Sequence, residues 1–189
     1  MQNTFPTELE DDEGRVYAIN PSYHTMLKIM RLWADVEVHQ IHKINLALKW
    51  FFPTSRPEDL KKALELIQGF LTYRSSDKPE NKKVTKRQFC YEFDAEEIYT
   101  SFIQAYRIDL IETDMHWFKF QILLANLPTN TAFGQKIQLR FASTKGLKGE
   151  ELNKLNAAKK KVQLPKPVEK VDVEEQKRLK EIWDKITVN

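Results

Sequence analysis

Two histidines lie three residues apart near the start of a predicted helix. His39 and His42 share one helix face at that spacing, and Glu37 lies just before them. Imidazole and carboxylate groups are ligands that zinc accepts, but a structural zinc site needs four of them. No third or fourth ligand stands at a matching spacing, so we interpret the pair as part of an exposed, hydrated helix face. We expect no metal and no cofactor.

Three titratable residues farther along the chain allow a second chemical interpretation. Asp109, Asp114 and His116 have the side-chain types of a general acid–base cluster. A simpler interpretation places Asp109 in a turn and Asp114 at the cap of the next helix, with the His116 ring packed and bonded to a nearby backbone group. Cys90 is the single cysteine, and no histidine stands in a recognisable relation to it as a general base. We therefore expect a protein that is not an enzyme.

Aromatic residues exceed what a small helical core needs. Most of them suit a core, and the others suit a groove that holds an amphipathic helix of another protein. The last predicted helix carries an apolar face with a tryptophan, a residue type favoured at binding hot spots, and packing against its own chain is an equal alternative. The candidates for partner binding are Trp50, Phe51, Phe52, Trp117, Phe118, Phe120, Leu179, Ile182, Trp183 and Ile186.

The composition predicts a mainly α fold for the elements that position these residues. Apolar residues make up 41% of the chain and charged residues 30%, and glycine occurs five times in 189 residues. Such a balance is typical of a globular protein. Scarce glycine with abundant Leu, Lys and Glu favours helices over a sandwich or barrel. We predict a compact multi-helix bundle with a small N-terminal β-hairpin and a C-terminal helical arm.

Apolar periodicity and cap residues set the expected elements. Asn20-Pro21 is expected to start the first helix, and Asp94 with Glu97 has the spacing of a capping box. Alternation at 89–93 predicts a short strand. In chain order we expect a hairpin at 7–19, then a helix from Asn20-Pro21, then helices at 38–51, 60–71, 94–106, 115–127, 129–141 and 150–162, and a last helix that carries Leu179 to Ile186.

A change in composition divides the chain into three expected parts. Residues 1–143 are predicted to form a helical domain with the hairpin, and residues 144–164 a polar, Lys-rich helix. Residues 165–189 are predicted to form a proline-containing linker and an amphipathic helix. Pro165 and Pro167 hold the linker extended, because proline fixes φ and restricts the residue before it.

Charge and hydropathy limit the partners. The net charge is +3, from 30 basic and 27 acidic side chains, so no strong field attracts nucleic acid. We interpret the basic clusters at 82–87 and 159–161 as solvated surface, with phosphate contact as the less favoured alternative. No apolar run approaches the ~20 residues that span a bilayer, and the acidic start at 1–14 lacks the apolar core of a signal peptide. We expect a soluble intracellular protein with no membrane partner.

A distinctive string of residues lies between 89 and 140. It contains Phe93-Asp94-Ala95, Ile98-Tyr99, Phe102, Tyr106, Ile108-Asp109-Leu110, His116-Trp117-Phe118-x-Phe120 and Leu127-Pro128. With these residues the chain resembles a bacteriophage family named after gene product fifteen. The resemblance extends upstream to Tyr17-Ala18-Ile19-Asn20, Leu27, Ala47-Leu48 and Pro57-Glu58-Asp59-Leu60. It covers about 16–140 and continues more weakly to 162, so residues 165–189 look like an addition.

The resemblance implies a role in phage assembly. Members of this family resemble tail assembly chaperones, which are small helical proteins encoded just before the tape measure protein. It implies that the chain binds the tape measure protein in the host cell cytoplasm and keeps it soluble while the tail tube forms, as a homo-oligomer. It brings no catalytic residues. Two alternatives stay open: a structural tail or connector component retained in the virion, and a nucleic-acid-binding phage regulator.

Overall fold

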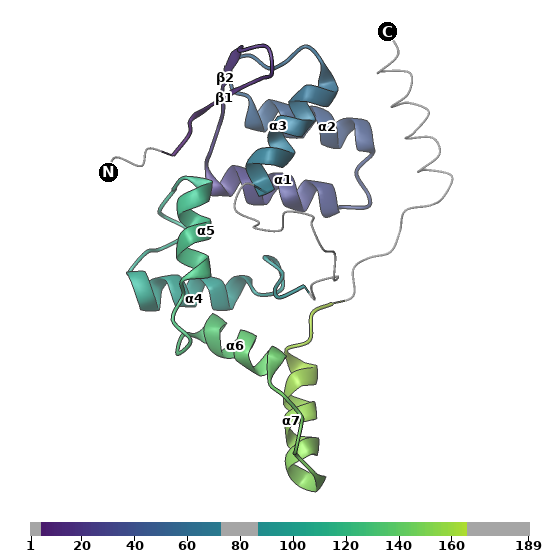
Figure 1. Cartoon of the computed structure of the whole chain (residues 1–189), viewed down its shortest axis with the longest axis vertical. Helices are drawn as coiled ribbons and strands as arrows, with labels where there is room; N and C mark the ends of the chain where they lie inside the picture. Colours follow the sequence, from purple (N-terminus) through teal and green to yellow (C-terminus); the bar gives the residue numbers. More distant parts are fainter. Residues whose placement is uncertain (1–4, 73–86, 166–189) are drawn as a thin grey trace. The chain divides into compact units, whose positions relative to one another are not determined.

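The computed structural model describes residues 5–72 and 87–165, which form two compact units (Figure 1). Unit 1 contains residues 5–72 together with Met115–Phe118, and unit 2 contains residues 87–114 and 119–165. The described residues form seven helices and one two-stranded antiparallel sheet, so the predicted mainly α class is confirmed.

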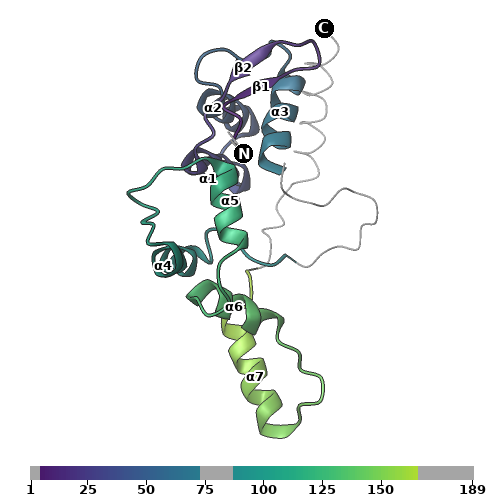
Figure 2. The ribbon, with the colours of Figure 1, turned by 60° about the vertical axis from the view of Figure 1, so that its left-hand side comes forward.

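The predicted N-terminal hairpin is present in unit 1. Strand β1 (Glu8–Glu10) pairs antiparallel with β2 (Val16–Ala18), and Leu9 stands opposite Tyr17. The turn between them needs Gly14, whose φ of 78° lies in the left-handed region that glycine adopts without a steric cost. Both ribbon views show the hairpin lying over α2 and α3 (Figure 2).

Three helices form the rest of unit 1: α1 (Tyr23–Ala34), α2 (Gln40–Phe51) and α3 (Leu60–Thr72). The predicted end of α2 before Pro53 is confirmed, because proline disfavours the helical region for the residue before it. Helix α3 begins at Leu60 as predicted, and the Asp59 carboxylate before it accepts hydrogen bonds from the backbone N–H groups of Lys61 and Lys62 at 2.8 and 3.4 Å.

The predicted start of α1 at Asn20-Pro21 is wrong by two residues, because Ser22 is the N-cap residue. Pro21 accepts a hydrogen bond from the Trp117 N–H, and Ser22 forms an isolated β-bridge with His116. This pairing with a distant segment keeps the backbone out of the helix. Asn20 still accepts a local bond, from the Ser22 N–H at 3.2 Å.

Unit 2 contains α4 (Ala95–Tyr106), α6 (Ala132–Phe141) and α7 (Gly149–Lys161), and α5 (Trp117–Ala125) begins in unit 1 and continues in unit 2. Thr131 caps α6 by accepting a hydrogen bond from the Gly134 N–H at 3.2 Å. Gly134 is required there, because a Cβ would lie 2.5 Å from the Pro128 carbonyl oxygen.

Two predicted features near unit 2 differ from the structure or lie outside it. The predicted strand at 89–93 is wrong, because the chain runs without regular structure to Cys90 and then turns at 91–94. Phe89 instead packs its ring against Phe133, and Tyr91 packs against Phe120, so aromatic contacts replace a strand pairing. The last predicted helix lies outside the described residues, and the predicted domain boundaries after residues 143 and 164 remain predictions.

Candidate functional site

The three aromatic candidates at the end of α2 are divided between the core and its edge. Phe51 is fully buried, and its ring meets those of Phe52 and Phe70 edge to face at 4.9 and 5.5 Å. Phe52 is buried as well, at 6% exposure. Trp50 is half-buried, and the Lys28 ammonium lies over its ring at 3.8 Å. The two phenylalanines therefore serve the core of unit 1, and Trp50 alone of the three reaches the surface.

The candidates in α5 are also core residues. Trp117 is 1% exposed, and its indole N–H donates to the Leu71 carbonyl oxygen at 3.4 Å. Phe118 stacks on Phe70 with ring centroids 4.7 Å apart. In unit 2, Phe120 stacks on Phe102 at 5.4 Å. All three side chains are buried in this chain, and their role in partner binding remains a prediction.

Four of the ten partner-binding candidates belong to the predicted C-terminal helix. Leu179, Ile182, Trp183 and Ile186 lie outside the described residues, so the structure does not test them. The same holds for the lysines at 82, 83 and 86. The neighbouring Arg87 donates from its Nε to the Phe89 carbonyl oxygen at 3.2 Å.

The histidine pair has a structural task at the start of α2. His39 is the N-cap residue, and its Nδ1 accepts a hydrogen bond from the Ile41 N–H at 3.4 Å. The His39 and His42 rings meet edge to face at 6.2 Å. Within residues 5–72 and 87–165, no three His, Cys, Asp or Glu side chains form a group that could hold a metal ion.

The supposed acid–base cluster is divided between the units. His116 belongs to unit 1, where its Nε2 contacts the Pro6 carbonyl oxygen at 2.9 Å and its Nδ1 accepts from the Phe118 N–H at 3.0 Å. This agrees with the simpler interpretation of a packed ring bonded to nearby backbone. Asp109 belongs to unit 2 and accepts from the Ile111 N–H at 2.8 Å, which is the predicted turn.

Unit 2 contains a buried charge cluster that was not predicted from the sequence. Asp94 is fully buried, and Arg140 binds its carboxylate through both terminal nitrogens at 3.1 and 2.8 Å. Lys136 reaches the same carboxylate at 3.0 Å and Glu97 at 2.7 Å. Burial alone raises the pKa of Asp94, but the bonds from Arg140, Cys90 and Lys136 outweigh it and hold the pKa below its usual range.

This cluster overturns the predicted capping box. Asp94 occupies the N-cap position of α4, but its side chain makes no cap hydrogen bond. Arg140 and Lys136 of α6 bind the Asp94 carboxylate instead, and Lys136 also binds the Glu97 carboxylate. These bonds are favoured because hydrogen bonds to a charged donor are about twice as strong as neutral ones. Arg140 also donates to the carbonyl oxygens of Gln88 and Val162, each at 2.7 Å. The guanidinium therefore joins α6 to the start of α4 and to the end of α7.

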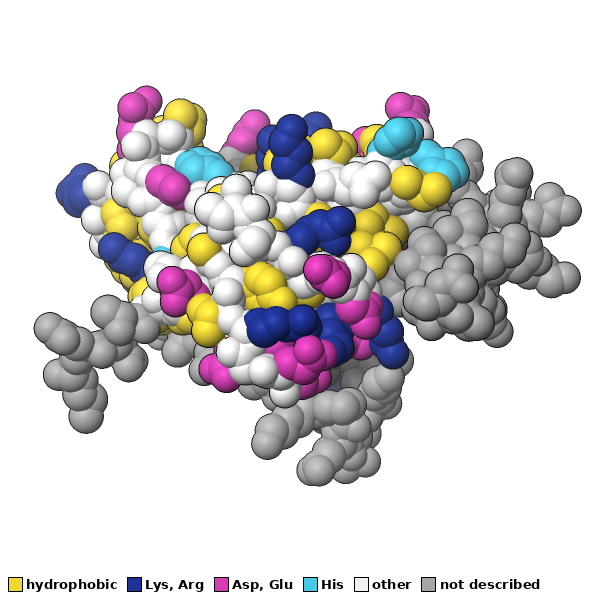
Figure 3. Space-filling view, turned by 90° about the horizontal axis from the view of Figure 1, so that it is seen from above, with side chains coloured by type: hydrophobic (Ala, Val, Ile, Leu, Met, Phe, Trp, Pro, Cys, Tyr) yellow, Lys and Arg dark blue, Asp and Glu magenta, His cyan; other side chains and the backbone are white. Residues whose placement is uncertain are grey.

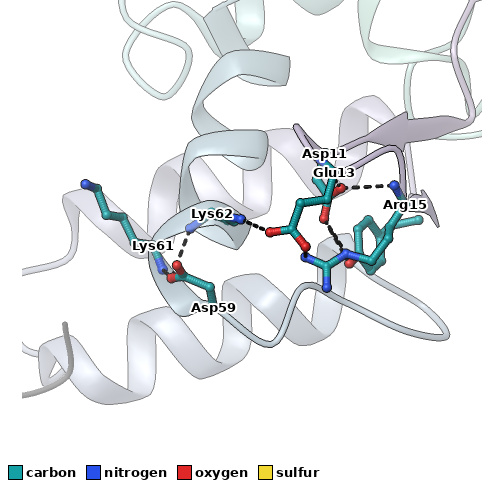
Figure 4. Close-up of polar contacts among 7 residues, drawn as sticks. Asp11, Glu13, Arg15, Asp59, Lys61 and Lys62 are labelled. Carbon is teal, nitrogen blue, oxygen red and sulfur yellow. Dashed lines mark hydrogen bonds and ion pairs between the residues drawn. The ribbon is translucent and has the colours of Figure 1, made fainter. Parts of the chain in front are cut away.

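A second carboxylate network fixes the hairpin turn of unit 1 (Figure 4). The Asp11 side chain accepts from the Glu13 and Arg15 N–H groups at 2.9 and 3.0 Å and from the Arg15 Nε at 2.9 Å. Burial raises the pKa of Asp11, but these bonds outweigh it and lower the pKa to about 2. Glu13 forms ion pairs with Arg15 and with Lys62, which connects the turn to α3.

A family model for Bacteriophage Gp15 protein matches residues 3–164. The chain belongs to this family. Comparison with curated proteins and with solved structures gives no match. Membership places the chain among phage proteins of the structural or assembly type.

The match clarifies which parts of this chain are family features. It includes the hairpin, which the resemblance read from the sequence did not cover in full, and it ends at residue 164, before the C-terminal segment. In the described part of the chain, no helix is both long and apolar enough to cross a membrane.

One feature of the sequence indicates the Asp94 cluster. Lys136 and Arg140 stand four residues apart in α6, on the same side of the helix as the buried Phe133. Two cations on an inward face require a buried acid, because unpaired charges are excluded from a core. The pattern indicates that a carboxylate is needed, but it does not say which one.

Proposed function

We propose that this protein is a tail assembly chaperone that binds the tape measure protein of its phage and keeps it soluble while the tail tube assembles. The observation that carries the proposal is the family match, which spans nearly all of the described chain. The family is of the structural or assembly type. Its resemblance to proteins encoded beside the tape measure gene supplies the client.

Binding rather than catalysis is supported by the roles of the titratable side chains. His39 caps α2, His116 contacts backbone at both ring nitrogens, and Asp109 shapes a turn. Asp94 is neutralised by Arg140 and Lys136. Each of these groups has a partner that stabilises the fold, so none of them is poised to act on a substrate.

The proposed mechanism is passive holding in the host cytoplasm. A tape measure protein is a very long helical chain, and its apolar stripes are exposed until tube subunits surround it. Several copies of a small helical protein cover such stripes and are displaced as the tube polymerises. Displacement by the growing tube requires no nucleotide.

Co-purification tests the proposal. The tagged chain is co-expressed with the product of the gene immediately downstream, and a stable complex is expected at moderate salt. Mass spectrometry of purified virions separates the chaperone from a retained tail component, because a chaperone is expected to be scarce or missing there. Failure to co-purify, with a client equally soluble alone, contradicts the proposal.

We further propose that the chain works as a homo-oligomer and that residues 166–189 join its copies. The prediction comes from the sequence, since Leu179, Ile182, Trp183 and Ile186 form an apolar face on a segment too short to be a stable helix alone. Truncation after Pro165 is expected to leave the melting temperature nearly unchanged and to lower the mass measured by light scattering. A large loss of melting temperature with the mass unchanged would show that the segment belongs to the core.

A further inference from the structure

Exposed aliphatic side chains gather at the turn between α1 and α2. Among the described residues, Val36 is 52% exposed and Ile41 44%, and Val38 between them is half-buried. Single exposed aliphatic residues are ordinary on a protein surface. Here three lie within six residues around one turn, a segment that we call the α1–α2 tip (35–42). Figure 3 shows hydrophobic side chains next to histidines at one edge of the face drawn.

Side chains at both ends of the α1–α2 tip fix its backbone. Asp35 ends α1, and its carboxylate accepts from the Glu37 N–H at 2.9 Å. His39 begins α2, and its Nδ1 accepts from the Ile41 N–H at 3.4 Å. Each bond restrains one end of the turn, and Val36 and Ile41 are exposed. A surface fixed in advance loses little conformational entropy when a partner binds.

The charge of the α1–α2 tip selects the kind of partner. Asp35 and Glu37 are exposed, and none of the ion pairs found in the described residues involves either carboxylate. Lys43 is buried and donates its ammonium to the Trp33 carbonyl oxygen at 3.3 Å. A partner that covers the aliphatic side chains also removes water from these two carboxylates. Cations on the partner compensate for this loss of hydration.

We propose that the α1–α2 tip docks an amphipathic helix whose apolar stripe is flanked by lysine or arginine. The inference rests on the proposed function, because it assigns a surface and a segment chemistry to the client of the chaperone. An acidic helix is disfavoured by repulsion from Asp35 and Glu37, and nucleic acid is disfavoured for the same reason. A second copy of this chain is a different occupant, which the experiment distinguishes.

The test uses the full chain and two synthetic amphipathic helices. One peptide carries a leucine stripe flanked by lysine, and the other has glutamate in place of each lysine. Fluorescence anisotropy measures their dissociation constants at low and at physiological salt. The lysine peptide is expected to bind about tenfold more tightly than the glutamate peptide, and salt is expected to reduce the difference.

Three variants assign the binding to the α1–α2 tip. The double variant Val36→Ser, Ile41→Ser is expected to weaken binding of the lysine peptide about tenfold, because it removes the apolar contact. Val16→Ser, at an equally exposed valine on β2, is the matched control and is expected to change nothing. Glu37→Lys is expected to weaken binding of the lysine peptide and to strengthen binding of the glutamate peptide. Melting temperatures establish that all three variants are folded.

Other outcomes overturn the inference. Equal binding by the double variant and the Val16→Ser control excludes the tip, and so does an unchanged peptide preference in Glu37→Lys. A double variant whose mass falls in light scattering without peptide present shows that the tip contacts another copy instead. If the parent chain retains the tape measure protein and the double variant retains it equally, the chaperone function stands and the tip is excluded. If the parent chain does not retain it, the proposed function fails, and the peptide titrations still decide what the tip binds.

Discussion

Two buried carboxylates stabilise the two units in different ways. Asp11 in unit 1 is bonded within its own turn, to Glu13, Arg15 and the Tyr17 hydroxyl. Asp94 in unit 2 is bonded mainly to α6, whose Arg140 lies 46 positions farther along the chain. The first carboxylate shapes a local turn, and the second joins separate elements. Both units also have an aromatic core, around Phe51 and Phe70 in unit 1 and around Phe102 and Phe120 in unit 2, but only in unit 2 does the buried carboxylate connect two helices, α4 and α6.

The difference shows where each unit is most sensitive to change. A local network can be lost while the surrounding contacts keep the elements in place. A buried charge that joins distant elements leaves its partners unpaired in the interior when it is lost, and that is costly. Four substitutions test this difference between the units, beginning with the one expected to destabilise the protein most.

Truncation of Trp117 is expected to have the largest effect. Trp117→Ala removes a fully buried aromatic side chain and is expected to lower the free energy of unfolding by about 3–5 kcal/mol. Urea denaturation measures the loss. Ile111→Ala, at a residue 72% exposed, is the control and is expected to shift stability by no more than about 0.5 kcal/mol. A Trp117→Ala protein as stable as the control would mean that this side chain belongs to a partner surface.

Loss of the Arg140 side-chain charge is expected to come next. Arg140→Met leaves Asp94 buried with Lys136 as its remaining cation, and the expected cost is about 3 kcal/mol. Lys136→Met keeps the two-nitrogen contact of Arg140 and is expected to cost less. If the two variants are equally stable in urea, Arg140 does not have the joining role assigned to it.

The pH dependence separates the two carboxylates further. The folded-state pKa of Asp11, about 2, is below the ordinary value near 3.9, so its contribution to stability is present above about pH 4 and is lost as the pH falls through 2. Between pH 4 and pH 2, the melting temperature of the Asp11→Asn variant is therefore expected to fall less than that of the parent protein. Parallel melting curves for parent and variant over that window would contradict the assignment.

The smallest effect is expected at the ion pair between the hairpin and α3. Lys62→Ala removes the contact with Glu13, whose side chain is 53% exposed. Exposed ion pairs contribute little because water and salt screen them. The melting temperature is expected to fall by no more than about two degrees, and added salt is expected to remove the difference. A larger fall that persists in salt would mean that the hairpin depends on this pair.

The local features of the fold could be predicted from the sequence. The hairpin, the end of α2 before Pro53 and the start of α3 after Asp59 follow from turn, proline and cap chemistry within a few residues. Apolar spacing also indicated the helix ranges, and residues at helical spacing such as Met26 and Ile29 are buried.

Features that depend on distant partners could not be predicted. The start of α1 is delayed because Pro21 and Ser22 pair with the segment that leads into α5. The capping box at Asp94 is absent because Arg140 and Lys136 compete for its carboxylate. Periodicity marked the aromatic candidates correctly as apolar, but burial of Phe51, Trp117 and Phe120 depends on what packs over them, which one sequence does not specify.

The solubility of the tape measure protein with and without this chain tests the proposed chaperone function. The client is expressed alone and with the parent chain, and the fraction of client left in the supernatant after centrifugation is measured. We expect a large soluble fraction with the parent chain, held in a complex with it, and a small fraction without it. Equal client solubility with and without the parent chain, and no complex between them, would contradict the assignment of this protein as a tail assembly chaperone.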